Sequence, residues 1–210
     1  VLLDNDQQKL KTYGEISREL SRRLDPDLTF EVTSDARAAL TGVDYIITTI
    51  RAGGDAGRLF DEQTCLAHGV LGQETTGAGG FAMAIRSVPT LVYYCTLARE
   101  VANPGHLIFN FTNPSGIITQ ALRSKGFDNV YGICDAPSGF IKQLEEILEI
   151  PYGTLDIECY GLNHLSWFRN AKVNGRDVQR ELLDNPRTYE HSEMRLFTRE
   201  MARISGDCML

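Results

Sequence analysis

The feature that most constrains the fold is an alternation along roughly the first 150 residues, where each short apolar run is followed by a segment with helical spacing. The apolar runs are VLLD, FEVT, DYIITTI, HLIFNF and NVYGIC. Helices are predicted at 8–23, 35–40, on both sides of a glycine-rich loop, at 114–125 and at 138–148. Strands joined by crossover helices form a parallel sheet covered on both faces. Because such crossovers are right-handed, the pattern predicts a Rossmann-like, doubly wound α/β fold.

The pattern changes near residue 152, where LDIECYGLNHLSWF and AKVNG predict longer antiparallel strands with a turn at Asn174–Gly175. A helix is predicted from Ser192 to Arg203, and Tyr189 is expected in a loop. We therefore expect a Rossmann-like domain at residues 1–151 and the start of an α+β domain at residues 152–210. The abrupt beginning VLLDND, without an initiator Met, indicates a missing N-terminus.

Charge and cysteine content limit the partners. Lys and Arg total 21 against 28 Asp and Glu, and this acidic balance argues against a nucleic-acid surface. A few placed arginines can still bind a phosphorylated small molecule. No apolar run approaches the roughly 20 residues of a membrane span, so no membrane partner is expected. Five cysteines without a CxxC pair predict free thiols and a cytoplasmic location.

Several polar residues follow the predicted strands, at the sheet edge where such folds bind ligands. Asp4 ends the first apolar run, where dinucleotide-binding folds place an acid for the ribose; an ordinary strand-end acid is the alternative. TTIRAGGDAGR carries Thr49, Arg51 and Arg58 around glycines, and a guanidinium group suits phosphate. The alternative is a flexible loop with solvated arginines.

Two further loops could reach a ligand. GQETTGAGG places Glu74 among glycines, which allow close backbone approach or a sharp bend. HLIFNFTNPSG places Asn110 and Asn113 before Pro114, and Asn-Pro is also a common turn initiator. Both a ligand role and a turn role remain open for these asparagines.

A cysteine and a histidine form a candidate metal pair. GICDAPSG places Cys134 and Asp135 after the last parallel strand, and GLNHLSW places His164 on the predicted first strand of the second domain. A thiolate and an imidazole together can bind a transition metal. A buried apolar cysteine and a structural histidine are the alternatives.

Six segments in this order resemble glycoside hydrolase family 4, the NAD- and metal-dependent 6-phosphoglycosidases. The segments are LLDND, IRAGGDAGRLFDE, GQETTGAGG, NFTNPSGIIT, GICDAP and GLNHLSW, and the resemblance covers nearly the whole chain. It implies a fold similar to that of lactate and malate dehydrogenases. It also implies that the first domain binds NAD and that the second begins a domain for metal and substrate.

The resemblance assigns a role to each candidate residue. Cys134 and His164 match the ligands of a divalent metal, usually Mn²⁺, and Glu74 matches the acid that tunes a catalytic tyrosine. The substrate-binding positions are Arg58, Asn113 and Asp135, and the cofactor-binding positions are Asp4, Thr49, Arg51 and Asn110. The family's first glycine-rich loop is expected before Val1, and its catalytic tyrosine beyond Leu210.

The implied reaction is hydrolysis of a phosphorylated disaccharide or glucoside. NAD⁺ accepts a hydride from the sugar C3, the metal assists removal of the C2 proton, elimination and water addition follow, and NADH returns the hydride. NFTNPSGIIT and GLNHLSW favour a 6-phospho-β-glucosidase. Asp135 favours the alternative, a 6-phospho-α-glucosidase, since β-specific members usually have Asn there. A homodimer or homotetramer is expected.

Two other functions fit the same architecture. A 2-hydroxy-acid dehydrogenase would need a His–Asp pair, and GLNHLSW lacks an Asp close after its histidine. A non-enzymatic NAD-binding regulator would not need Cys134 and His164 together. Net NADH production would identify the dehydrogenase, and NAD binding without metal would identify the regulator.

Overall fold

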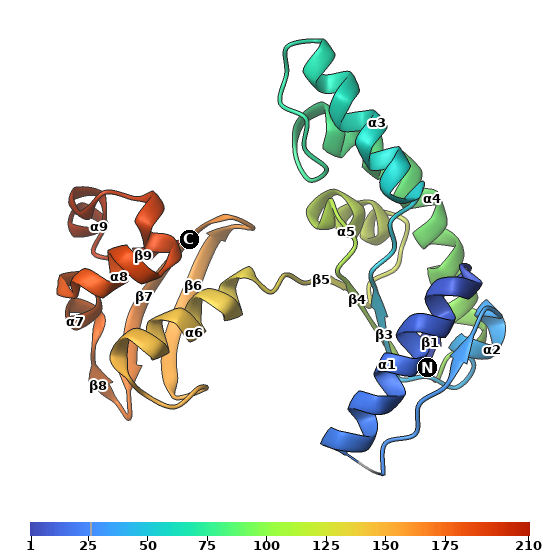
Figure 1. Ribbon diagram of the computed structural model, residues 1–210, viewed down its shortest axis with the longest axis horizontal. Coiled ribbons are helices and arrows are strands. Elements are labelled where there is room, and N and C mark those ends of the chain that lie inside the picture. The colour runs from blue at the N-terminus through green and yellow to red at the C-terminus, as the bar shows by residue number, and fades with distance from the viewer. Residues whose placement is uncertain (26) are drawn as a thin grey trace. The chain divides into compact units, whose positions relative to one another are not determined.

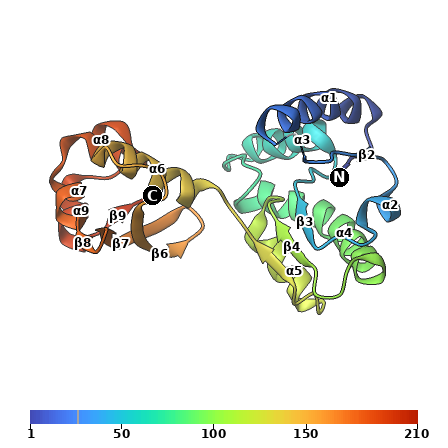
Figure 2. The ribbon, with the colours of Figure 1, turned by 90° about the horizontal axis from the view of Figure 1, so that it is seen from below.

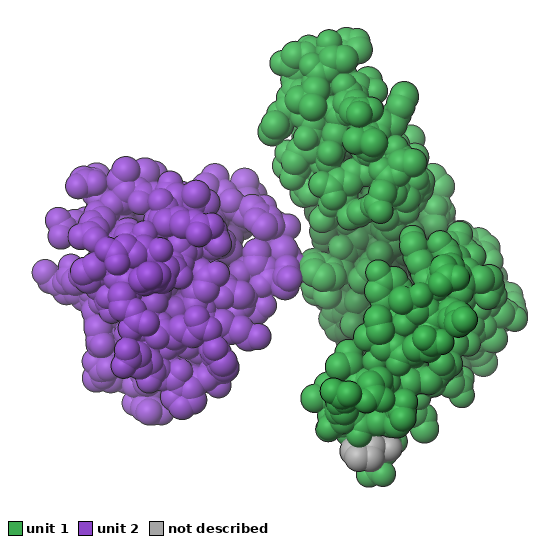
Figure 3. Space-filling view, in the orientation of Figure 1, with its two compact units in different colours: residues 1–133 green, residues 134–210 purple. Residues whose placement is uncertain are grey.

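The computed structural model describes residues 1–25 and 27–210. The chain divides into two compact units, Val1–Ile133 and Cys134–Leu210, which are coloured separately in Figure 3. The second unit begins before the predicted domain boundary because helix α6 (Ala136–Leu148) packs against the antiparallel strand β6 (Leu155–Leu162). The predicted boundary between two domains, at residues 151 and 152, stays a prediction.

Parallel strands form the centre of the first unit. Strand β1 (Leu2–Leu3) pairs with β2 (Val32–Thr33). A second parallel ladder has the order β3–β4–β5, with bounds Tyr45–Thr48, Leu107–Asn110 and Val130–Gly132 (Figure 1). Every apolar run predicted as a strand contains one, and the pairing is parallel as expected.

Helices connect these strands. Their bounds are α1 Gln7–Leu24, α2 Ala36–Leu40, α3 Gly54–Ala67, α4 Gly77–Val101 and α5 Ser115–Ser124. The Asp6 carboxylate accepts hydrogen bonds from Gln8 N and Lys9 N at the start of α1, and Asp35 caps α2 in the same way. These side chains satisfy backbone donors that a helix leaves free at its N-terminus.

The core of the first unit lies on one side of β3–β4–β5. Side chains of α2, α4 and α5 bury the inward strand residues Ile108 and Val130, which are 2% and 0% exposed. The opposite side presents Tyr45, Ile47 and Tyr131, all exposed. Successive strand residues point to opposite faces, so in the described part of the chain only one face of this ladder is packed by helices.

Helix α4 corrects one expectation. By length and composition it could cross a membrane, although no such segment was expected from the sequence. Its Leu91, Cys95 and Ala98 are at most 2% exposed, within the core of the first unit. A helix buried in a globular core has the same apolar character as a membrane span. This packing accounts for the buried face of α4, whereas Phe81, Ile85 and Tyr93 of the same helix are exposed.

The second unit is an antiparallel sheet packed by helices. Strands β6, β7 (Leu165–Val173) and β8 (Arg176–Asp177) are neighbours in that order, and β9 (Cys208–Met209) pairs with β7. Strands β6, β7 and β9 lie side by side in both Figure 1 and Figure 2. Phe140 of α6 packs on Phe168 of β7 with ring centroids 4.8 Å apart, which makes this contact the centre of the core.

Three local expectations for this unit are wrong, and one is confirmed. The predicted helix 192–203 is divided into a 3₁₀ turn, Glu193–Leu196, and α9, Arg199–Ser205, because Thr198 caps a new helix through its hydroxyl. Tyr189 lies in helix α8 (Pro186–His191), not in a loop; α7 spans Gln179–Asp184. His164 lies in the turn between β6 and β7, not on a strand.

The predicted turn at residues 174–175 is confirmed, and it joins β7 to β8.

Candidate functional site

The carboxyl ends of β3 and β4 are tied together by polar side chains. The Thr48 hydroxyl donates to Asn110 Oδ1 at 2.9 Å, and the backbone N–H of Ile50 donates to the Thr112 hydroxyl at 2.9 Å. These bonds hold the loops after the two strands at one edge of the sheet. Exposed Thr49 and half-buried Asn113 lie in these two loops.

Asn110 lies inside this network rather than on its surface. The side chain is fully buried, and its Nδ2 donates to the Thr119 hydroxyl at 3.1 Å and to the Thr112 carbonyl at 3.3 Å. Its amide therefore serves protein groups in the described chain. Any contribution of Asn110 to cofactor binding would act through the loops that it holds.

Two arginines and a glutamate from the predicted motifs come together in the first unit. Glu74 Oε2 lies 3.5 Å from Arg51 Nη2 and 3.8 Å from Arg58 Nε. Arg51 also pairs with Asp55 at 2.5 Å, and Arg58 pairs with Glu62 at 2.8 Å. Arg51, Arg58 and Glu74, separate in sequence, form one cluster, which we call the arginine cluster.

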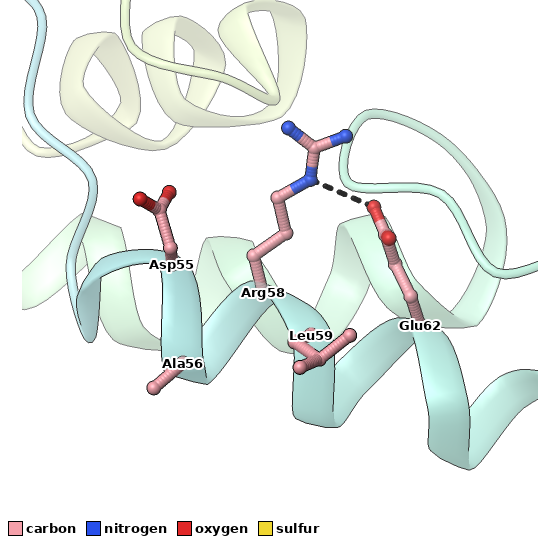
Figure 4. A pocket seen from close by; sticks show the side chains of 5 residues that line it. All are labelled: Asp55, Ala56, Arg58, Leu59 and Glu62. Atoms are coloured by element: carbon pink, nitrogen blue, oxygen red, sulfur yellow. Dashed lines mark hydrogen bonds and ion pairs between the residues drawn. The ribbon is translucent and has the colours of Figure 1, made fainter.

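The charges of the cluster reinforce one another. The hydrogen bond from Arg58 to Glu62, and then the charge of Glu74, raise the pKa of the Arg58 guanidinium. The hydrogen bond from Arg51 lowers the pKa of the Asp55 carboxyl. Arg58 and Glu62 line an open pocket of about 430 Å³ on α3, where Figure 4 shows the Nε joined to Glu62. The cluster is thus charged and accessible, and each of its two guanidinium groups is paired with carboxylates.

The loop that carries Glu74 is held against the start of α4. The Gln73 side-chain oxygen accepts hydrogen bonds from the backbone N–H groups of Thr75 and Thr76, at 2.5 and 2.7 Å. A Cβ at Gly79 would lie 2.5 Å from the Gln73 carbonyl oxygen. Glycine is required at this position because the loop backbone lies directly over the helix.

Two residues beside the cluster were not identified from the sequence. Arg86 of α4 forms a two-pronged ion pair with Asp61 of α3, and its Nε donates to the Ala52 carbonyl at 3.3 Å. Arg86 is the one charged residue between positions 77 and 98 of the sequence. A lone arginine in so apolar a helix was the signal that could have identified it, because a buried charge needs a partner.

In the second unit Cys134 and His164 lie together although 30 positions separate them. Cys134 Sγ and His164 Nε2 are 3.5 Å apart. Cys134 directly precedes the N-cap residue of α6, and His164 occupies the β6–β7 turn with a φ of 131°. The half-buried sulfur and the exposed imidazole meet at the surface of this unit.

This geometry fits two ligands of one metal ion. With the bond lengths of zinc, about 2.3 Å to sulfur and about 2.1 Å to nitrogen, an angle of roughly 90–110° puts the ligand atoms about 3.1–3.6 Å apart. Among residues 1–25 and 27–210, no third His, Cys, Asp or Glu completes a group of three with them. A metal held by this pair would need ligands from elsewhere, such as substrate oxygens or water.

The two remaining candidate acids stand apart from these pairs. Asp4 follows β1, is half-buried, and accepts a hydrogen bond from Asp6 N at 2.8 Å. Asp135 is exposed at the N-cap of α6 and does not cap the helix with its side chain. Asp4 keeps the strand-end position predicted for it, and Asp135 adjoins the metal pair in sequence.

Known proteins resemble most of this chain. It is 35% identical over 187 residues to the 6-phospho-β-glucosidase BglT of Thermotoga maritima, which covers 88% of this chain and 44% of that protein. It is 34% identical over 195 residues to the phospho-α-glucosidase PagL of Clostridium acetobutylicum, covering 89% and 43%. The chain therefore spans less than half the length of these relatives.

Solved structures agree with the fold. A 6-phospho-β-glucosidase from Thermotoga maritima, solved with manganese, NAD⁺ and glucose 6-phosphate, superposes with a TM-score of 0.82 and 30% identity. It covers 99% of this chain and 49% of that one. The malate dehydrogenase of Aeropyrum pernix, 11% identical with a TM-score of 0.59 and coverage of 99% and 63%, shares the fold alone.

The sequence model described as family 4 glycosyl hydrolase matches residues 1–150. This match spans most of the chain, and relatives above 30% identity cover nearly all of it. The fold is Rossmann-like, as the order of its strands and helices predicted. The chain belongs to glycosyl hydrolase family 4.

Proposed function

We propose that this chain supplies the NAD-binding, metal-binding and phosphate-binding parts of an enzyme that hydrolyses 6-phospho-glucosides. The observation that carries the proposal is the distance of 3.5 Å between Cys134 Sγ and His164 Nε2 in a family 4 chain. Hydrolases that use two carboxylates do not need such a pair, whereas the NAD-dependent family is an exception to the two-carboxylate rule.

The described residues divide the work. Arg58 would bind the phosphate through its guanidinium group, with Glu62 holding the Nε side, and Asn113 and Asp135 would contact the sugar. Cys134 and His164 would hold a divalent ion and leave its other positions to substrate oxygens. Glu74 is half-buried and would act on a nearby tyrosine base supplied by another part of the protein.

The cofactors follow from the same family. NAD and Mn²⁺ are both present in two solved 6-phospho-glucosidase structures. When bound, NAD would accept and return a hydride, and the metal would stabilise negative charge beside the resulting carbonyl. Asp4, Thr49 and Arg51 would contact the dinucleotide at the carboxyl ends of the strands, where such folds bind it, and Asn110 would support them.

The β anomer is the proposed substrate, and the α anomer is the second candidate. BglT favours the first, and PagL favours the second at nearly the same identity. Asp135 belongs to the α pattern, while the segments around Asn113 and His164 belong to the β pattern. A homo-oligomer in the cytoplasm, where phosphorylated sugars are retained, completes the proposal.

The proposal is tested by cofactor dependence in the native protein. Removing NAD with charcoal and metal with EDTA should abolish hydrolysis of p-nitrophenyl 6-phospho-β-glucoside, and restoring both should be required to recover it. No net NADH should accumulate. Hydrolysis without either cofactor would contradict the proposal. Net NADH production from a 2-hydroxy acid would assign the protein to the dehydrogenases instead.

A further inference from the structure

Arg86 contacts two segments that carry the arginine cluster, helix α3 and the loop that follows Arg51. Its two terminal nitrogens pair with the carboxylate of Asp61 on α3, and its Nε donates to the carbonyl of Ala52 in the loop that follows Arg51. A Cβ built on Gly53 would lie 3.1 Å from Arg86 Nε, and one on Gly57 would lie 3.5 Å from Arg86 Nη2. The guanidinium group therefore lies directly against the glycine-rich loop.

The ion pair between Arg86 and Asp61 is more buried than the surface ion pairs. The side chain of Asp61 is 6% exposed and that of Arg86 is 32% exposed. By comparison, Arg37 and Glu100 bridge α2 and α4 at 2.7 Å with side chains 59% and 55% exposed. A buried carboxylate needs its partner, whereas an exposed pair contributes little.

The pair links every segment that carries the cluster. Arg51 precedes Ala52 in the loop, Arg58 lies one turn before Asp61 on α3, and Glu74 precedes the start of α4, which carries Arg86. Because Arg86 attaches both Ala52 and Asp61 to helix α4, it sets the distances between Arg51, Arg58 and Glu74. A displacement of about 1 Å in such groups can reduce catalysis by about a hundredfold.

We propose that Arg86 and Asp61 are a positioning pair, which touches no ligand and sets the geometry of Arg51 and Arg58 for a phosphorylated substrate. The identity of the ligand, a phosphorylated substrate, rests on the proposed function. The contacts of Arg86 with Asp61 and Ala52 do not depend on it. A pair with a purely structural role would stabilise the fold without altering the loop or the affinity for phosphate.

The decisive variant is the double substitution Asp61→Asn with Arg86→Met in the native protein. Arg86→Met alone should lower Tm by on the order of 10 °C, because it leaves a buried carboxylate unpaired. The double variant removes both charges and should recover most of that loss. The matched control is Arg37→Met with Glu100→Gln, which removes an exposed pair from the same unit.

Two measurements separate positioning from stability. With NAD⁺ and Mn²⁺ present, the double variant should bind glucose 6-phosphate at least tenfold more weakly than the native protein, while the control should bind it normally. Hydrogen exchange should speed up about tenfold or more at the Gly54 and Gly57 amides, which donate to Arg51 and Gly53 carbonyls at 2.9 and 3.0 Å. If the double variant does not fold, Arg86→Lys is measured in the same way.

Native affinity and native exchange in the double variant would overturn the positioning role. If the native protein binds no glucose 6-phosphate, the proposed function fails, and hydrogen exchange at Gly54 and Gly57 still decides the geometry. Faster exchange at these amides in the double variant, with the control unchanged, supports the proposal that Arg86 and Asp61 hold the loop in place. Unchanged exchange there contradicts it.

Discussion

The arginine cluster of the first unit and the metal pair of the second are built in different ways. Arg58 is held by Glu62 and Glu74, and the loop beside it is held by Arg86 and Asp61. Cys134 and His164 meet at an exposed turn with no third ligand among the described residues. Arg58 has two carboxylate partners, whereas a metal held by Cys134 and His164 would have no other ligand among the described residues. Single substitutions should therefore have unequal effects in the two regions.

The largest expected difference is in the rate at which thiols react, which tests whether Cys134 is accessible to solvent. Burial raises the pKa of the Cys208 thiol to about 12 and that of the Cys95 thiol to about 11. At pH 8 the thiolate of Cys208 should be about a thousandfold scarcer than that of an unshifted thiol. Half-buried Cys134 and exposed Cys159 should react with Ellman's reagent in the metal-free native protein, well before Cys95 and Cys208.

The raised pKa of Cys208 also predicts how the stability of the protein depends on pH. Because the pKa of folded Cys208 is raised, its contribution to stability is complete below about pH 9 and is lost as the pH rises toward 12. Cys208→Ala should therefore flatten the alkaline loss of stability. In denatured, non-reduced protein, all five cysteines of this chain should be free thiols, as peptide mapping after alkylation would show. Alkylation of three or fewer of these five cysteines, or fast labelling of Cys208 in the folded protein, contradicts this picture.

The second effect is loss of the metal. Cys134→Ser should reduce Mn²⁺ affinity and hydrolysis by on the order of a hundredfold or more, since a metal ligand is removed from a pair without redundancy. Cys159→Ser is the matched control, because Cys159 is an exposed cysteine of the same unit, on strand β6 of the hairpin that carries His164. Titration of Mn²⁺ by calorimetry measures both. Unchanged Mn²⁺ affinity in Cys134→Ser would remove this residue from the site.

The third effect is loss of the phosphate contact. Arg58→Ala should lower kcat/KM for a phosphorylated glucoside by roughly 10- to 100-fold, as expected for a charge-assisted hydrogen bond. Activity on the unphosphorylated glucoside should change much less. Arg176→Ala, which removes an exposed ion pair with Glu181, is the control. Equal losses on both substrates would show that Arg58 does not bind the phosphate.

The smallest effect tests redundancy directly. Glu62→Gln should raise KM only a few-fold, because Arg58 keeps Glu74 and loses one of two carboxylates. The Tm should change little, since the side chain of Arg58 is 41% exposed. Steady-state kinetics on the phosphorylated glucoside gives the value. A loss as large as that of Arg58→Ala would mean that the cluster has no redundancy.

The sequence predicted the parallel strands and the ligand-bearing loops because each leaves a local signal. Asp4, Thr49 and Asn110, at or next to the ends of apolar runs, marked the carboxyl edge, and glycines marked the loop backbones. The pairing of Arg86 with Asp61 across 25 positions depends on how α3 packs on α4, and no local pattern encodes that contact. The turn position of His164 was missed because apolar residues on both sides of it continue the strand pattern.

The split of the C-terminal helical segment was missed for a related reason. Residues 192–203 have a helical composition throughout, but Thr198 accepts a hydrogen bond from Met201 N and so begins a new helix. Propensity alone does not reveal such a break, because a capping hydroxyl is favourable only where the preceding backbone is already extended. Packing of Met194 and Ala202 into the core sets that geometry.

One measurement tests the central claim most directly: hydrolysis of a 6-phospho-β-glucoside by the native protein in D₂O, with NMR analysis of the sugar product. If the C2 proton is removed during each turnover, deuterium should appear at C2, and its appearance should require both NAD⁺ and a divalent metal. Direct displacement by two carboxylates leaves the C2–H bond intact. Product without deuterium at C2, formed without NAD⁺, would contradict the account.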